Sequence, residues 1–127
     1  MGAYVEQSEV VGPFADLKRE DMAAVIPAII SEAQRVVEGD IGGIVDLDKL
    51  GQLVKVPGIV WVLTQAKARE LAFVAHYGGS IPEDGGQVTH WADIYKNGLA
   101  MLKAGEYDAQ LADVLLPRAR YGTVEAI

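Results

Sequence analysis

The residues of this sequence best suited to acid–base or metal chemistry are its two histidines, His76 and His90. Asp93 follows His90 by three positions, the helical spacing at which a carboxylate can orient an imidazole as a general base or a metal ligand. A metal site needs three or four converging ligands, and the sequence has no HExxH or ExxH pattern to supply them. We therefore expect both histidines to be structural or exposed, and we expect neither a metal nor another cofactor.

The glycine-rich segment that holds Asp40, Asp46 and Asp48 superficially resembles a calcium-binding loop. It lacks the alternate-position acids and the terminal glutamate of an EF-hand, so we interpret these aspartates as turn residues and helix caps. The sequence also has no phosphate-binding glycine loop and no nucleophile elbow. Because cysteine is absent, thiol catalysis, cysteine-based zinc sites and disulfides are excluded. These patterns favour a protein that is not an enzyme.

Aromatic residues are the next candidates for a binding site. Trp61, Tyr77, Trp91 and Tyr95 could be imagined as a ligand cage. They lie on or beside the apolar faces of predicted helices, where aromatic side chains most often fill the space between helices. We therefore expect them to pack in the core.

The chain after residue 106 combines apolar residues with a basic pair. Arg118 and Arg120 are either solvated charges on a disordered end or part of a docking arm, in which they would meet acidic groups of a partner. In the second interpretation neighbouring apolar side chains would fill pockets of that partner. The candidate residues for binding a partner are Leu115, Leu116, Pro117, Arg118, Arg120 and Tyr121.

Composition limits the protein to one small domain that does not wrap nucleic acid. The 127 residues are 50% apolar, enough for one modest core. With 18 acidic and 11 basic residues the formal charge is −7, whereas binding along a nucleic-acid backbone depends on lysine and arginine. The longest apolar runs fall far short of the ~20 residues that span a bilayer, and no secretory signal pattern is present. We expect a soluble, intracellular protein.

Apolar periodicity predicts helices that position these residues. Asp16 is placed to cap a first helix that ends at Ala24. Pro27 lacks an amide proton and disfavours helical geometry at the residue before it, so we expect it in the first turn of a second helix that ends near Glu38. Residues 39–56 are glycine-rich, and the pattern leaves a long loop, a short helix around 47–53 and a small hairpin as open alternatives.

Two longer helices follow. The first begins at Pro57, carries a broad apolar stripe and ends at Gly78 in a left-handed conformation, with Gln65, Lys67, Arg69 and Glu70 on its polar side. The second covers 87–103, and the short connection between the two favours antiparallel packing.

These elements predict a mainly α protein, a small antiparallel helical bundle with extended N- and C-terminal arms. We expect a flexible arm at 1–14, a helical domain at 15–106 and a docking arm at 107–127. The apolar residues of this last arm have no predicted helix left to bury them, which indicates an intermolecular contact.

The order of these pieces resembles the head-to-tail connector (adaptor or head-completion) proteins of tailed bacteriophages. The resemblance covers roughly residues 15–110 and rests on the segments ADLKRED, AIISEAQRVVEGDI, VPGIVWVLTQAKARELAFVAHY and YKNGLAMLKAGE. It implies a structural subunit of a dodecameric ring in the virion neck, assembled in the bacterial cytoplasm. The implied partners are the portal protein, neighbouring copies, tail or stopper proteins, and double-stranded DNA that passes through the channel without specific binding.

A small acidic helical module that regulates or binds another protein is the alternative. Such a module needs carboxylates concentrated on one face, whereas here they are scattered from Glu6 to Glu125. An enzyme that uses His90 and Asp93 is a third possibility, which a bound metal in a concave pocket would support.

Overall fold

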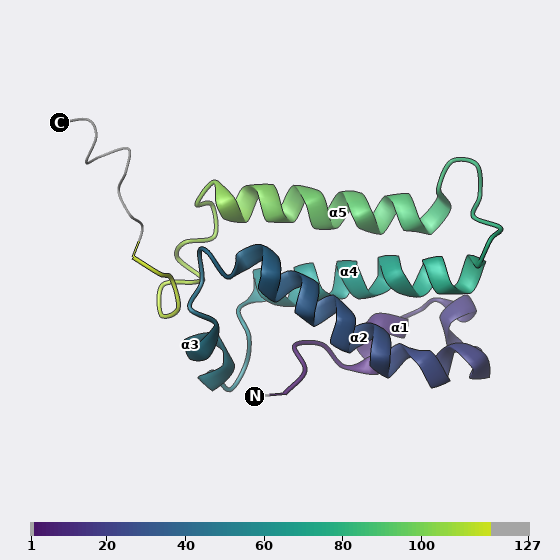
Figure 1. Ribbon diagram of the computed structural model, residues 1–127, viewed down its shortest axis with the longest axis horizontal. Helices are drawn as coiled ribbons and strands as arrows, with labels where there is room; N and C mark the ends of the chain where they lie inside the picture. Colours follow the sequence, from purple (N-terminus) through teal and green to yellow (C-terminus); the bar gives the residue numbers. More distant parts are fainter. Residues whose placement is uncertain (1, 118–127) are drawn as a thin grey trace.

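The computed structural model describes residues 2–117 and is mainly helical (Figure 1). Within this range no strand is present, although Val45 and Leu115 form an isolated antiparallel bridge. The predicted helical bundle is confirmed. Its elements are α1 (Gln7–Val11), the 3-10 helix η1 (Ala15–Lys18), α2 (Glu20–Ile41), α3 (Leu47–Gln52), α4 (Gly58–Tyr77) and α5 (Gly86–Lys103).

Helix α4 is the centre of the bundle, and α2 and α5 pack along it in the opposite direction (Figure 1). Its buried residues lie around the whole circumference of the helix, as expected for a helix covered on all sides. They are Ile59, Val60, Leu63, Thr64, Ala66, Ala68, Arg69, Ala72 and Phe73. On α5, Gly98 permits close approach, because a Cβ atom there would lie 3.1 Å from Leu63 Cδ2. As predicted, α4 ends at Gly78. Its φ is +57°, but its ψ of −122° lies outside the left-handed helical region that we expected.

Pro27 lies inside one continuous helix, which corrects the predicted break between two shorter helices. It is exposed, whereas Met22, Ile26 and Ile30 on the same helix are buried against α4. The proline cannot bond to the carbonyl of Ala23 four residues earlier. That carbonyl instead accepts a hydrogen bond from Gln7 Nε2 at 3.4 Å. Apolar burial on both sides of the proline therefore holds the helix together.

The N-terminal segment also differs from the flexible arm that we expected at 1–14. Tyr4 and Val5 are buried, and α1 packs on α4 with Val10 fully buried. The Tyr4 amide donates to Gln34 Oε1 at 2.7 Å, and the Tyr4 hydroxyl donates to Glu38 Oε2 at 2.6 Å. The described part of this segment belongs to the body of the domain.

Residues 39–56 adopt the short-helix alternative. Helix α2 continues to Ile41, and α3 begins after Asp46, whose side chain accepts from the amides of Asp48 and Lys49. The interpretation of this aspartate as a helix cap is thus confirmed.

The C-terminal segment is partly buried in its own bundle, contrary to the prediction of an unpaired arm from 107 onward. Leu111 and Val114 are buried in the core. The Leu116 amide donates to the Ile44 carbonyl at 2.8 Å, and the Asp46 amide donates to the Val114 carbonyl at 2.7 Å. Gln110 Oε1 accepts from the amide of Ile59 at 3.0 Å and so caps α4, which has no side-chain cap from Pro57. The turns after α5 bring these residues back over the core.

Candidate functional site

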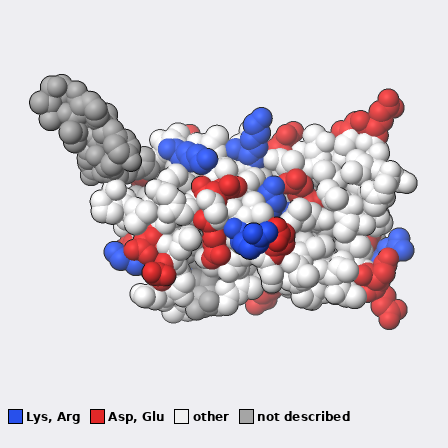
Figure 2. All heavy atoms as spheres, in the orientation of Figure 1, with Lys and Arg blue, Asp and Glu red and all other residues white. Residues whose placement is uncertain are grey.

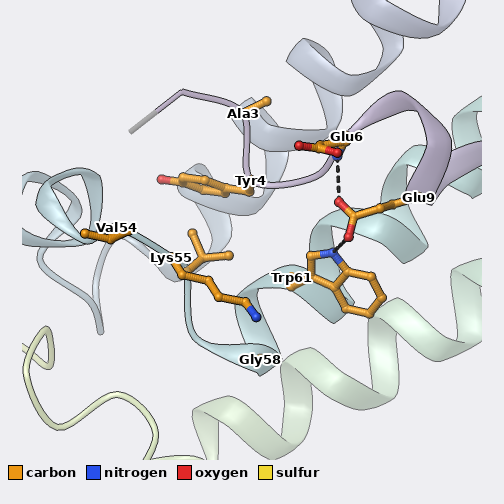
Figure 3. A pocket seen from close by; sticks show the side chains of 9 residues that line it. Ala3, Tyr4, Glu6, Glu9, Val54, Lys55, Gly58 and Trp61 are labelled. Carbon is orange, nitrogen blue, oxygen red and sulfur yellow. Dashed lines mark hydrogen bonds between the residues drawn. The ribbon is translucent and has the colours of Figure 1, made fainter.

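A hollow in the described surface lies between the N-terminal segment, the connection from α3 to α4, and the first turn of α4 (Figure 3). It encloses about 640 Å³. Its lining combines acidic, basic, aromatic and aliphatic groups. The lining residues are Ala3, Tyr4, Glu6, Glu9, Val54, Lys55, Val56, Gly58 and Trp61. We call this hollow the N-terminal cavity.

A carboxylate held in place by two hydrogen bonds forms one wall of the N-terminal cavity. Glu9 Oε1 accepts from the Glu6 amide at 2.8 Å, and Glu9 Oε2 accepts from Trp61 Nε1 at 2.9 Å. The Glu6 side chain in turn accepts from the backbone of α1, which completes a reciprocal cap. Each carboxylate oxygen can accept more than one hydrogen bond, so both glutamates retain acceptor capacity. Figure 3 shows Glu6, Glu9 and Trp61 gathered on one side.

The opposite wall carries Tyr4, Val54 and Lys55 (Figure 3). Burial raises the pKa of the Tyr4 hydroxyl above its ordinary value, and the hydrogen bond to Glu38 adds to this shift. Val54 is fully exposed, and Lys55 has no ion-pair partner among residues 2–117. The lining presents charged groups of both signs beside aromatic rings, a chemistry that suits the binding of a charged segment.

Arg69 is the buried residue that sequence reasoning missed, because its position on α4 placed it on the predicted polar side. Its Nε donates to the Val10 carbonyl at 2.9 Å, and its Nη2 donates to the Glu9 carbonyl at 3.0 Å. Gln65 Nε2 also donates to the Glu9 carbonyl, at 3.1 Å. These bonds satisfy carbonyls at the C-terminal end of α1, where the helix leaves them unpaired.

The surroundings of Arg69 are apolar on the remaining sides. Its guanidinium lies 4.9 Å from the ring centre of Phe14 and 4.6 Å from that of Trp91. Burial lowers the pKa of Arg69 from its ordinary value. A Cβ atom at Gly12, where φ is +50°, would lie 2.5 Å from Nη2.

A second polar group links the long helices. Tyr95 on α5 donates a short hydrogen bond to Asp40 on α2, and Lys67 on α4 lies over the Tyr95 ring at 4.4 Å from its centre. Lys67 also pairs with Glu70 at 2.8 Å. Burial raises the pKa of Tyr95, with contributions from Asp40 and Glu70. Each member has a partner, so this group tethers α5 to α2.

The two histidines lie apart from these groups. His90 and Asp93 are both exposed on α5, and the His90 ring contacts Trp91. His76 Nε2 lies 3.6 Å from Asp16 Oδ2 near the end of α4. Within residues 2–117 no group of three or more His, Asp or Glu side chains could hold a metal ion.

The aromatic residues lie as the sequence predicted, within packing clusters. Tyr95 is buried, and Trp61, Tyr77 and Trp91 are half-buried against the two clusters of core residues.

The predicted docking residues fall into three groups. Leu115 and Leu116 are half-buried, and Leu115 packs on the core. Pro117 is exposed at the end of the described chain. Arg118, Arg120 and Tyr121 lie outside the described residues. The structure therefore assigns part of the predicted arm to the bundle itself.

No helix in the described range is long and apolar enough to cross a membrane. Comparison with family models, with curated proteins and with solved structures gave no match.

Proposed function

We propose that the protein is a structural head-to-tail connector subunit of a tailed bacteriophage, located in the neck of the virion. The order of segments in the sequence supports this proposal. The pieces that resemble connector proteins coincide with η1, α2, α4 and α5, the elements of one helical body. In this role copies of the chain form a ring under the portal and around the DNA channel.

The incomplete burial of α5 is the observation that carries the proposal. This 18-residue helix packs mainly along α4, with the Tyr95 hydroxyl bonded to Asp40 of α2, and only Tyr95 and Leu102 on it are buried. Val88, Trp91, Ile94 and Leu99 are half-buried and pack against the core with part of their surface accessible, and Met101 is exposed. An edge helix with this much accessible apolar surface suits contact with another subunit.

The charge distribution suits a channel through which DNA slides. The net charge of −7 repels the phosphate backbone. Figure 2 shows acidic and basic side chains interspersed over one face, with no broad basic field on it. A ring of such subunits surrounds a duplex without holding it, whereas lysine- and arginine-lined surfaces bind and retain it. Portal, tail or stopper proteins then contact the two ends of the ring.

The test combines electron microscopy and native mass spectrometry of the protein alone and mixed with the portal of the same virus. We expect rings on the portal. Rings that form only when the portal is present satisfy the proposal, even if the protein by itself is monomeric. Met101→Lys, on an exposed apolar residue of α5, should weaken ring formation at least tenfold. Ala100→Lys, at the adjacent exposed position, is the matched control. A protein that stays monomeric and does not bind the portal would contradict the proposal.

A further inference from the structure

We propose that the N-terminal cavity binds the segment Arg118–Ile127 of a neighbouring copy. The inference rests on the self-association in the proposed function and names the surfaces that meet. The cavity is open, and its walls carry both signs of charge beside aromatic rings. A short peptide segment with basic, aromatic and acidic side chains matches those walls.

The acidic wall supplies the first part of the match. Glu9 is fixed by its bonds to the Glu6 amide and to Trp61, so its oxygens are oriented before any ligand arrives. The exposed Glu6 carboxylate lies beside it. A guanidinium binds two carboxylate oxygens at once and also stacks on an indole face. Arginine is thus the side chain that this wall recognises best.

The opposite wall supplies the second part. Lys55 is exposed, and no residue in the described range forms an ion pair with it. Val54 beside it is a fully exposed aliphatic residue. The acidic group of a ligand would form an ion pair with Lys55, and an apolar side chain of the same ligand would cover Val54.

The sequence after the described chain has this composition. It reads RARYGTVEAI. In the proposed complex Arg118 and Arg120 pair with the glutamates of the acidic wall, and Glu125 pairs with Lys55. Tyr121 and Val124 supply apolar contact. Hydrogen bonds hold the chain to its own bundle as far as Leu116. Residues 118–127 lie outside the described structure, and the charges and apolar side chains of their sequence are the reason for choosing them as the ligand.

A neighbouring copy is the occupant that fits the proposed ring. The cavity and the segment are two different surfaces of one chain. When such surfaces pair between copies, the interface is heterologous, and a closed rotation of heterologous contacts produces a ring. Insertion into the cavity of the same chain would use both surfaces within one subunit and leave no link between subunits.

Disulfide trapping in the full chain tests this arrangement, because the natural sequence has no cysteine. One variant carries Val54→Cys at the cavity rim, and another carries Ala119→Cys between the two arginines. Mixed and oxidised, they should form a covalent heterodimer on a non-reducing gel. Ala100→Cys on α5 replaces Val54→Cys in the control mixture and should give at least fivefold less heterodimer. Equal amounts in both mixtures would overturn the proposal.

The double variant Val54→Cys/Ala119→Cys separates the two sources of the segment. A cross-linked species that migrates as a monomer, with no heterodimer from the mixed single variants, would show insertion in the same chain and overturn the proposal. Covalent dimers and higher oligomers support it.

A peptide-binding measurement tests which charged side chains contribute to the affinity between the segment and the cavity. A labelled peptide of residues 117–127 should bind a chain truncated after Pro117, and Glu6→Gln or Lys55→Gln should each weaken binding at least threefold. Replacing both arginines of the peptide by glutamate should abolish binding. Binding that is unchanged by these substitutions would contradict the assigned contacts.

Rings on the portal without any cross-link would refute the cavity assignment alone, whereas cross-links without portal binding would refute the connector role alone.

Discussion

At the scale of single residues, Arg69 shows how a buried cation can serve as a structural clamp. Its bonds to the carbonyls of Glu9 and Val10 join α4 to α1 over a long separation in sequence. Hydrogen bonds from charged groups contribute about 1.5–3 kcal/mol, and removing one partner leaves the other unsatisfied. The side chain therefore fixes the N-terminal segment, and with it the acidic wall of the N-terminal cavity.

We expect Arg69→Met to lower the free energy of unfolding by about 2–3 kcal/mol, because the Val10 carbonyl loses its side-chain donor and the Glu9 carbonyl keeps only the bond from Gln65. Arg35→Met removes an arginine from the exposed face of α2, where it pairs with Glu32, and should change stability by less than about 1 kcal/mol. Urea unfolding measures both. Similar losses in the two variants would show that Arg69 has no special role.

The two tyrosines with raised pKa values predict a loss of stability in alkali. Burial holds the pKa values of Tyr4 and Tyr95 above the ordinary value of 10.0, which the unfolded chain retains. Above pH 10 the unfolded state loses these protons while the folded state keeps them. Their contribution is complete below pH 10 and then falls by at most about 1.4 kcal/mol per pH unit for each tyrosine. Denaturant unfolding of Tyr4→Phe/Tyr95→Phe between pH 9 and 11 should show a shallower decline than the natural sequence.

At the scale of elements, α2 shows packing overriding a local signal. Pro27 interrupts the hydrogen-bond ladder of a helix whose buried residues continue on both sides of it. We expect Pro27→Ala to raise the free energy of unfolding by about 1–2 kcal/mol, since the restored amide can bond to the Ala23 carbonyl. Pro82→Ala, in the connection before α5, should give no gain. Thermal unfolding measures both, and destabilisation by Pro27→Ala would mean that the packing requires the proline.

The same contrast explains what could be predicted from the sequence. Helix α4 was predictable because Pro57 and Gly78 mark its two ends, and α5 was predictable because its apolar residues recur at helical spacing. The continuity of α2 was not predictable, because Pro27 lacks an amide proton and disfavours helical geometry at the residue before it, which indicated a break. The N-terminal cavity was not predictable either. It depends on Glu9 meeting Trp61 across the fold, and pairing over such a separation in sequence leaves no periodic pattern.

At the scale of the whole molecule, the described end of the chain holds the fold through Leu111 and Val114, and we propose the residues after it for binding. Deletion of 118–127 should leave the free energy of unfolding unchanged within about 0.5 kcal/mol. Deletion of 112–127 should reduce it by about 2–4 kcal/mol, because Val114 is buried and its carbonyl accepts from Asp46. Urea unfolding of the two truncated chains gives the comparison. Equal stability would show that the bridge to Leu115 contributes nothing.

The shorter deletion should also abolish ring assembly on the portal if the docking residues lie beyond Pro117. Electron microscopy of the truncated chain with the portal measures this effect directly. Full assembly without 118–127 would assign the contact to other surfaces, with α5 the first to examine.

The bond between Gln110 and the amide of Ile59 has a consequence for biosynthesis. The first turn of the central helix receives its cap from a residue 51 positions later in the chain. When translation has reached only α5, the nascent chain therefore has an uncapped central helix and a core that lacks Leu111 and Val114. Cooperative folding has to wait until the chain as far as Val114 has been synthesised, so translation that stops before this point leaves exposed apolar surface for chaperones and proteases to recognise.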